Sequence, residues 1–374
     1  NMRSSDISTY ENLKKIPWIK IYIKKLLNIF LFSRAEKKYF VLGIREKEFL
    51  SCLPKNSTVL IVQSFKEIIF ALRNRFDFIY FGLIEYYLIR ALFENKPQYL
   101  KEIVKNASRI LSRNIHPSLL IYFNDVQPME VLFSRVATNL YKKMTTVCGQ
   151  HGVFLDRDYD DVVQVGYYSD YFLTIGNSQK KLAHARLGSK TKVINLGPLK
   201  SLSKLDPSNI IEVILVSNGG ADVDEARSKL TANLILNLSR VLEKNSIGHL
   251  IKPHPSDDPS LFSESNKVFL GDKSELLTKK PRVFIGFVSS LLYEAHTIGH
   301  TTIEIKFRKK GFSLGHYESN TFITDHSFYE DQLEEISNTL ISMKEVQRNE
   351  TDSYYFEPLE NRVLSSLAKI ERDS

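Results

Sequence analysis

The strongest chemical signal is residues 250–255 (LIKPHP), at the end of an expected strand. Pro253 and Pro255 restrict the backbone on both sides of His254 and prevent a helix from starting there. The imidazole is therefore held at the carboxyl edge of the strand, where it can donate to a phosphate or to a departing phosphate oxygen. Lys252 adds a positive charge. The alternative is a rigid loop that carries an incidental exposed histidine.

A second signal follows in residues 286–290 (GFVSS). Gly286 turns the chain after an expected strand, and Ser289 and Ser290 open an expected helix. Free N–H groups and hydroxyls at a helix N-terminus form an anion site. Glu294 lies one turn further and can accept hydrogen bonds from ribose hydroxyls. A plain serine N-cap is the alternative, but both loops end strands and should line the same cleft.

A weaker signal is the turn at Asn218, Gly219 and Gly220, after the first strand of the second half. The two glycines let backbone amides approach a phosphate or a sugar. The turn lacks the full dinucleotide-binding fingerprint, so it supports the same site only by its position.

In the first half, polar residues follow two expected strands. Asn124 and Asp125 end one strand, where they either cap the next helix or present Asp125 to the cleft as a base. Gln150, His151 and Gly152 end the following strand in a tight loop that displays the histidine. We expect Asp125 and His151 to share the catalytic work on this side, and the other three residues to contact the acceptor.

The elements that position these residues alternate between strands and helices. Strands that are apolar throughout, with helices between them, indicate parallel sheets covered on both faces. We therefore expect an α/β protein with two Rossmann-like domains and ligands in the cleft between them. The expected strands are residues 39–42, 59–63, 78–81, 119–123 and 145–148, then 211–216, 248–251, 268–270, 283–285 and 302–305. The expected helices are residues 84–92, 129–143, 222–243 and 289–298, with a helical tail from 328 to 374.

The boundary between the domains is expected within residues 197–207, which are rich in Gly, Pro, Ser and Lys and have no periodicity. We place the acceptor-binding domain at residues 1–203 and the nucleotide-sugar-binding domain at 204–374. The last helix is an element that can return to the first domain.

The charge distribution points to an anionic partner at one end of the chain. The formal net charge is +8, and residues 1–38 contribute nine Lys and Arg against three Asp and Glu. Residues 12–34 have a polar stripe opposite a broad apolar face, as in helices that lie in a membrane interface; a helix that caps the first core is the alternative. The rest of the chain is nearly neutral, which argues against a nucleic-acid groove.

Cysteines and metal-binding motifs place further limits on the function. The chain of 374 residues has two cysteines far apart, which favours a reducing, cytoplasmic compartment. No stretch of about 18 uncharged apolar residues predicts a spanning helix, and no signal-peptide pattern is found. The histidines are scattered and match no metal motif. We expect neither a metal nor another cofactor to be required.

Together, K-P-H-P and, some 30 residues later, G-x-x-S-S-x-x-x-E-A resemble the HP and Ser-Ser motifs of bacterial GT-B glycosyltransferases that use CMP-activated acid sugars. These include sialyltransferases, polysialyltransferases and capsule Kdo transferases. The resemblance covers about residues 118–305. It implies that His254, Ser289 and Ser290 contact the CMP phosphate and that Lys252, Pro255 and Glu294 surround the nucleotide.

This resemblance implies a metal-independent transferase of surface-polysaccharide synthesis (capsule, O-antigen or lipooligosaccharide) at the inner face of the cell membrane. It would move sialic acid, a related nonulosonate or Kdo from a CMP-sugar to a glycan hydroxyl. The chain lacks the acidic Asp/Glu-Asp/Glu-Gly motif that supplies the base in the sialyltransferases, so Asp125 or His151 must replace it. The alternatives are a transferase for another nucleotide sugar, a CDP-polyol phosphotransferase and a membrane-associated scaffold.

Overall fold

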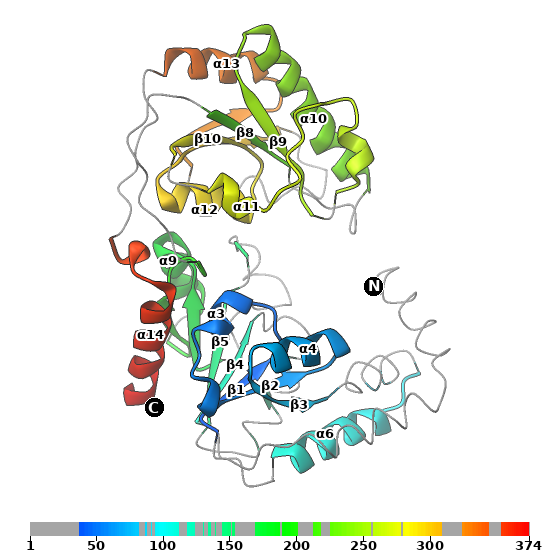
Figure 1. Cartoon of the computed structure of the whole chain (residues 1–374), viewed down its shortest axis with the longest axis vertical. Coiled ribbons are helices and arrows are strands. Elements are labelled where there is room, and N and C mark those ends of the chain that lie inside the picture. The colour runs from blue at the N-terminus through cyan, green and yellow to red at the C-terminus, as the bar shows by residue number, and fades with distance from the viewer. Residues whose placement is uncertain are drawn as a thin grey trace.

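The chain is described from a computed structural model, in which two parallel sheets form two domains (Figure 1). The residues described are 37–81, 87, 91, 94–111, 118–123, 130, 134–135, 139, 144–150, 152–153, 169–187, 189–200, 212–217, 225–255, 257–277, 280–308, 324–343 and 353–373.

The first domain is built on a seven-stranded sheet with the order β3-β2-β1-β4-β5-β6-β7. All its strand pairs are parallel. The strands are β1 (Tyr39–Leu42), β2 (Thr58–Val62), β3 (Asp77–Tyr80), β4 (Leu119–Phe123), β5 (Thr145–Gly149), β6 (Tyr171–Thr174) and β7 (Lys192–Asn195). The helices are α3 (Lys47–Ser51), α4 (Phe65–Arg73), α6 (Gln98–Leu111) and α9 (Asn177–Leu187), with a 3-10 turn at Lys55–Ser57. Because β1, β2 and β4 are buried along their whole length, their residues are apolar except Thr58, whose hydroxyl donates to the Pro54 carbonyl, and Tyr39 and Tyr122.

The second domain is built on a five-stranded parallel sheet with the order β12-β11-β10-β8-β9. Its strands are β8 (Glu212–Val216), β9 (His249–Lys252), β10 (Arg282–Gly286), β11 (Thr301–Lys306) and β12 (His326–Tyr329). Its helices are α10 (Glu225–Lys244), α11 (Lys273–Leu276), α12 (Ser290–Ile298) and α13 (Leu333–Ser342), with a 3-10 turn at Pro259–Phe262. The strand order reverses at β8, because β9 lies on one side of it and β10 on the other. Ligands of doubly wound sheets bind beyond the carboxyl ends of the strands at such a switch point.

The last helix, α14 (Leu359–Asp373), follows a 3-10 turn at Ser353–Phe356 and packs on the first domain. Val363 and Leu367 belong to the core of the first sheet. The guanidinium of the buried Arg362 donates to the carbonyls of Leu196 (2.7 Å) and Lys200 (2.6 Å). The C-terminal helix therefore holds the chain segment that leaves the first sheet.

The two domains also meet through Tyr293 of α12. Its hydroxyl lies 2.8 Å from Ser178 Oγ at the start of α9. A side chain at Gly176 would overlap the same tyrosine, so the absence of a Cβ there permits the close approach. Burial raises the pKa of Tyr293 to about 12, so the phenol stays protonated at this contact.

The prediction of an α/β fold with two Rossmann-like domains is confirmed, but two local predictions differ from the structure. Residues 268–270 were expected to form a strand, but in the structure they make only one bridge, from Val268 to Ile251. Phe328 was expected to begin a helical tail and lies in the edge strand β12. Both segments lie where a sheet has few neighbours, so their sequences carry a weak signal. Among the described residues, no helix has the length and apolar character that crossing a bilayer requires.

Candidate functional site

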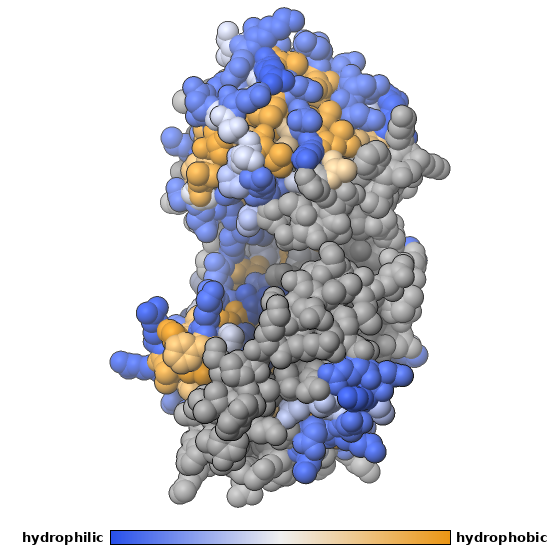
Figure 2. All heavy atoms as spheres, turned by 90° about the vertical axis from the view of Figure 1, so that its right-hand side faces the viewer, coloured by the Kyte–Doolittle hydropathy of each residue, from blue (hydrophilic) through white to orange (hydrophobic). Residues whose placement is uncertain are grey.

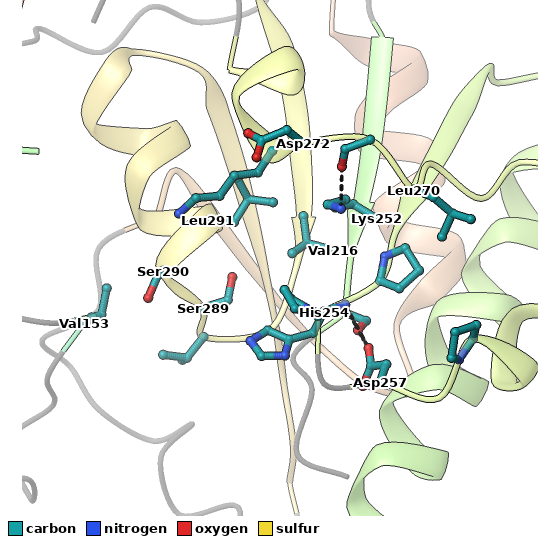
Figure 3. A pocket seen from close by; sticks show the side chains of 17 residues that line it. Val153, Val216, Lys252, His254, Asp257, Leu270, Asp272, Ser289, Ser290 and Leu291 are labelled. Carbon is teal, nitrogen blue, oxygen red and sulfur yellow. Dashed lines mark hydrogen bonds between the residues drawn. The ribbon is translucent and has the colours of Figure 1, made fainter. Parts of the chain in front are cut away.

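The loops that follow β8, β9 and β10 converge on a cavity of about 860 Å³ (Figure 3). Its walls include Lys252, His254, Ser289 and Ser290 from the two strongest sequence motifs. Val153, after β5 of the first domain, closes part of the opposite side. The site thus lies at the switch point of the second sheet and faces the first domain.

The loop after β9 (residues 252–255), which we call the HP loop, is fixed through its backbone. The N–H of His254 donates to Ser217 Oγ (3.1 Å) and to Asp257 Oδ2 (2.9 Å). These bonds hold the main chain and leave the imidazole exposed at the cavity. Figure 3 shows this ring pointing toward the side on which Ser289 lies. The geometry suits donation to an anionic ligand.

Asp257 organises this loop and was not singled out in the sequence. Its carboxylate is buried and accepts from the hydroxyls of Ser217 and Ser228 (3.2 Å to the latter) as well as from the His254 N–H. It therefore joins the end of β8, the start of α10 and the HP loop. The sequence did contain a signal, because two adjacent aspartates precede Pro259. Only Asp258 caps the 3-10 turn that follows, so Asp257 must have another role.

Lys252 and Lys273 bring positive charge to the cavity. Lys252 Nζ donates to the Gly271 carbonyl at 2.8 Å and lies 5.7 Å from the centre of the Phe269 ring. Asp272, also in the wall, caps α11 by accepting from the Ser274 N–H. Hydrogen bonds from the Ser274 side chain and then from its N–H lower the pKa of Asp272. The wall thus carries two ammonium groups and two carboxylates, and both carboxylates accept hydrogen bonds from within the protein.

The loop after β10, which we call the Ser-Ser turn (residues 286–290), leads into α12. Ser289 is the N-cap, and its Oγ accepts from the Leu292 N–H at 3.1 Å. Its hydroxyl proton can still be donated to a ligand, and the first N–H groups of α12 point toward the same end. Ser290 is the first helical residue and also lines the cavity. A nine-residue helix aimed at the cavity adds a partial positive charge there.

Gly286 begins this turn and Glu294 lies one helical turn beyond it, but neither is among the cavity walls. A Cβ at Gly286 would overlap the Val216 carbonyl, so the glycine permits β8 and β10 to approach closely. Glu294 pairs with Lys273 at 2.7 Å and lies 4.0 Å from Lys200. The Glu294 carboxylate binds Lys273, which lines the cavity, and is not itself part of the wall. The role of Glu294 at a ribose therefore stays a prediction.

In the first domain, Gln150 is buried and its amide is fully engaged. Its Nε2 donates to the Gly152 carbonyl at 2.9 Å and to the Gln179 side chain, and its Oε1 accepts from the Ile175 N–H at 3.2 Å. Gln150 thus ties its loop to the start of α9. Gly152 has φ +84° and lies against the second domain, since a Cβ there would stand 3.5 Å from Ser290 Oγ.

The remaining predicted site residues lie outside the described residues, so their roles stay predictions: Asn124, Asp125, His151, Asn218, Gly219 and Gly220. Within the part of the chain that the structure describes, no three His, Cys, Asp or Glu side chains gather as metal ligands would.

Comparison with known proteins supports the fold. No protein-family model and no curated protein matches this sequence. The structure is similar to that of Methanocaldococcus jannaschii UDP-GlcNAc 2-epimerase in complex with UDP-GlcNAc and UDP, with a TM-score of 0.53 and 12% identity over 90% of this chain and 100% of that chain.

Two further structures are more distant. CalG4, the calicheamicin glycosyltransferase, has a TM-score of 0.48 and 11% identity over 91% of this chain and 98% of that chain. A variant of the wall teichoic acid polymerase TagF has a TM-score of 0.48 and 10% identity over all of both chains. At these identities the similarity to the epimerase establishes a shared two-domain, GT-B-type fold and leaves the reaction to be argued from the site.

Proposed function

We propose that this chain is a glycosyltransferase that moves an acid sugar from a CMP-activated donor to a glycan hydroxyl. The supporting observation is that the HP loop and the Ser-Ser turn, which the sequence places about 30 residues apart, line one cavity at the switch point of the second sheet. A volume of about 860 Å³ lies within the range of pockets that hold small-molecule ligands.

The proposed chemistry builds negative charge on the leaving CMP phosphate while the sugar becomes oxocarbenium-like. The cavity offers donors for that charge from His254, from the hydroxyls of Ser289 and Ser290, and from the N-terminus of α12. Preorganised donors of this kind each stabilise a transition state by about 3 kcal/mol. Lys252 lies in the same wall and can place its ammonium group beside the departing anion.

The acceptor hydroxyl must lose its proton to a base, and we propose that the first domain supplies it. Support comes from the position of Gly152 against Ser290, because the loop after β5 then borders the donor cavity. We favour Asp125 as the base and His151 for positioning the acceptor. Asp125→Asn keeps the size of the side chain and removes its basicity. Full activity in this variant, together with an inactive His151→Ala enzyme, would exchange the two assignments.

The donor is tested by calorimetry on the full chain with CMP, CDP, UDP and GDP. We expect CMP to bind at least tenfold more tightly than UDP or GDP. A preference for UDP or GDP would reject the CMP-sugar donor, and a preference for CDP together with transfer of a polyol phosphate would favour the phosphotransferase. Failure of all four nucleotides to bind would favour the scaffold.

We further propose that the acceptor is a lipid-linked glycan at the inner face of the cell membrane. The support is the charge of residues 1–38, a net +6 that accompanies several aromatic residues. Each Lys or Arg near an anionic surface contributes about 1 kcal/mol, and salt screens this attraction. The full chain should bind anionic vesicles at low salt and be released in part at high salt. Binding that does not change with salt would contradict this.

A further inference from the structure

Helix α4 carries more apolar surface than the core of the first domain uses. Ile68 and Ala71 form its buried face on the first sheet. On the outer side, Phe65 is 73% exposed and Leu72 is 61% exposed. Together with the partly exposed Ile69 they follow the spacing i, i+4, i+7, so they lie along one face of the helix. Isolated exposed apolar residues are common on proteins, but an apolar stripe of this kind calls for a partner.

The stripe is presented by a well-defined helix start. Ser64 accepts from the Glu67 N–H at 3.3 Å, and the Glu67 carboxylate accepts from the Ser64 N–H at 3.2 Å, so both halves of a capping box are present. Glu67 is the one acidic residue of α4, and its charge is engaged at the helix N-terminus.

The groups beside the stripe are basic. Lys66 and Arg73 each follow an exposed apolar residue and are themselves exposed, as is Arg75 just beyond the helix. The nearby Asp77 pairs with Lys37. Helix α4 lies on the side of the lower domain that faces the viewer in Figure 1, and this side forms the left edge of Figure 2. Apolar and strongly hydrophilic side chains lie next to each other at that edge. Apolar residues beside cations match an anionic bilayer surface in both chemistry and charge.

The helix also lies at a useful distance from the cleft. Phe65 follows β2, at the carboxyl edge of the first sheet, and β2 is separated from β5 by β1 and β4. Three strand spacings correspond to about 15 Å along the sheet. A membrane that contacts the start of α4 would therefore be close to the loop of Gln150 and Gly152, on the acceptor side.

We propose that α4 is a membrane-contact helix, with Phe65 and Leu72 entering the headgroup region of an anionic bilayer and Lys66, Arg73 and Arg75 binding lipid phosphates. The inference depends on the proposed function only for the identity of the acceptor. Binding of α4 to lipid does not need the donor chemistry. The surface that would bind is separate from residues 1–38.

The apolar part is tested with the full chain and vesicles of phosphatidylglycerol and phosphatidylcholine at low salt, by co-sedimentation. The double variant Phe65→Ser, Leu72→Ser should bind these vesicles at least tenfold more weakly. The matched control is Ile341→Ser, because Ile341 lies on α13 of the second domain and is also 61% exposed. This control should bind like the wild type.

The basic part is tested by Lys66→Gln and by the pair Lys66→Gln, Arg73→Gln. Because each cation near an anionic surface contributes about 1 kcal/mol, we expect about fivefold weaker binding per residue, and no change on pure phosphatidylcholine. Lys244→Gln is the control, since Lys244 is 76% exposed at the end of α10. The charge variants keep the apolar stripe, so they test the proposal even if the double serine variant fails to fold.

Wild-type vesicle binding in both sets of α4 variants would overturn the proposal and assign the membrane contact to other residues. A wild-type dimer in sedimentation that Phe65→Ser, Leu72→Ser converts to a monomer would overturn it in favour of an interface between two copies of the chain. A CMP titration on the same variants separates this result from the donor proposal, because α4 lies outside the donor cavity and nucleotide affinity should stay unchanged.

Discussion

The HP loop and the Ser-Ser turn face the same cavity but are held in place by different means. The HP loop depends on the buried Asp257, which gathers donors from β8, α10 and the loop itself. The Ser-Ser turn depends on a bond between Ser289 and the Leu292 N–H, three residues away. One loop is assembled by long-range contacts and the other by its own helix.

This difference predicts unequal sensitivity to substitution. A buried carboxylate with several donors is costly to remove, because each donor is left without a partner in a region poor in water. A helix cap contributes about 1 kcal/mol, and its loss leaves the rest of the helix in place. We therefore expect the HP loop to be the more fragile half of the site.

The largest effect is expected at the side chain that the HP loop presents. His254→Ala should lower turnover about 100-fold if the imidazole donates to the leaving phosphate. The protein should unfold at the same urea concentration as the wild type, because this side chain is exposed. Steady-state assays and urea unfolding measure the two quantities. Activity within a factor of three of the wild type would remove His254 from the chemistry.

Next in size is the removal of the carboxylate behind the loop. Asp257→Ala should lower the free energy of unfolding by about 3 kcal/mol, since three donors lose this acceptor and only the His254 N–H keeps another, Ser217 Oγ. Asp257→Asn should restore part of this loss, because its carbonyl can still accept. The matched control is Asp258→Ala, since Asp258 is exposed and caps only a 3-10 turn. Equal losses at the two positions would contradict the assignment of Asp257 as the organising residue.

A pH experiment probes the support of the Ser-Ser turn. Glu304 pairs in register with Gly286, and burial raises its pKa to about 7 from an ordinary 4.5. The folded state then holds a proton that the unfolded state has released, so stability falls between about pH 4.5 and 7 and levels off above. Glu304→Gln should remove this slope and add about 3 kcal/mol at pH 8. An unchanged slope in urea unfolding across this range would show that Glu304 titrates normally.

The smallest effect is expected at the cap itself. Ser289→Ala should lower the free energy of unfolding by about 1 kcal/mol, and Ser290→Ala by less, since only Ser289 caps α12. In nucleotide titrations both variants should bind CMP more weakly, because both hydroxyls face the cavity. A fall in stability at Ser290 that exceeds the fall at Ser289 would contradict the capping geometry.

The same contrast explains how much of the site could be predicted from the sequence. Ser289 was found because capping is local, and the prolines around His254 marked the HP loop. Asp257 was not recognised from the sequence, because its partners Ser217 and Ser228 lie 40 and 29 residues away along the chain. Gln150 was expected to contact the acceptor, and that role stays a prediction. The contacts by which its buried amide holds the loop to α9 follow no local pattern and were not foreseen.

The fold followed the same rule. Central strands such as β4 and β10 are buried at every position, so their apolar runs were recognised. The edge strands β7 and β12 are only partly buried and carry polar residues, and they were missed. The inner strand β6 was missed as well, although it is buried at all four positions. For residues 268–270 the error was the reverse, since a strand was predicted that the structure does not form. Leu270 is apolar, which suggested burial, yet it is 75% exposed. The edge strands β3 and β9 were recognised and the buried strand β6 was not, so position in the sheet does not by itself decide which strands a sequence reveals.

The buried Arg362 makes the two domains hard to separate as pieces of chain. Its guanidinium occupies the carbonyls of Leu196 and Lys200, and α14 completes the core around the first sheet. A fragment that stops after the first sheet would leave those carbonyls bare and Val363 and Leu367 missing from that core. A fragment that begins at the second sheet would carry an amphipathic helix whose apolar face and Arg362 have lost the first sheet that covers them. An exchange of domains with another enzyme of this fold therefore requires two junctions, one on each side of the second sheet.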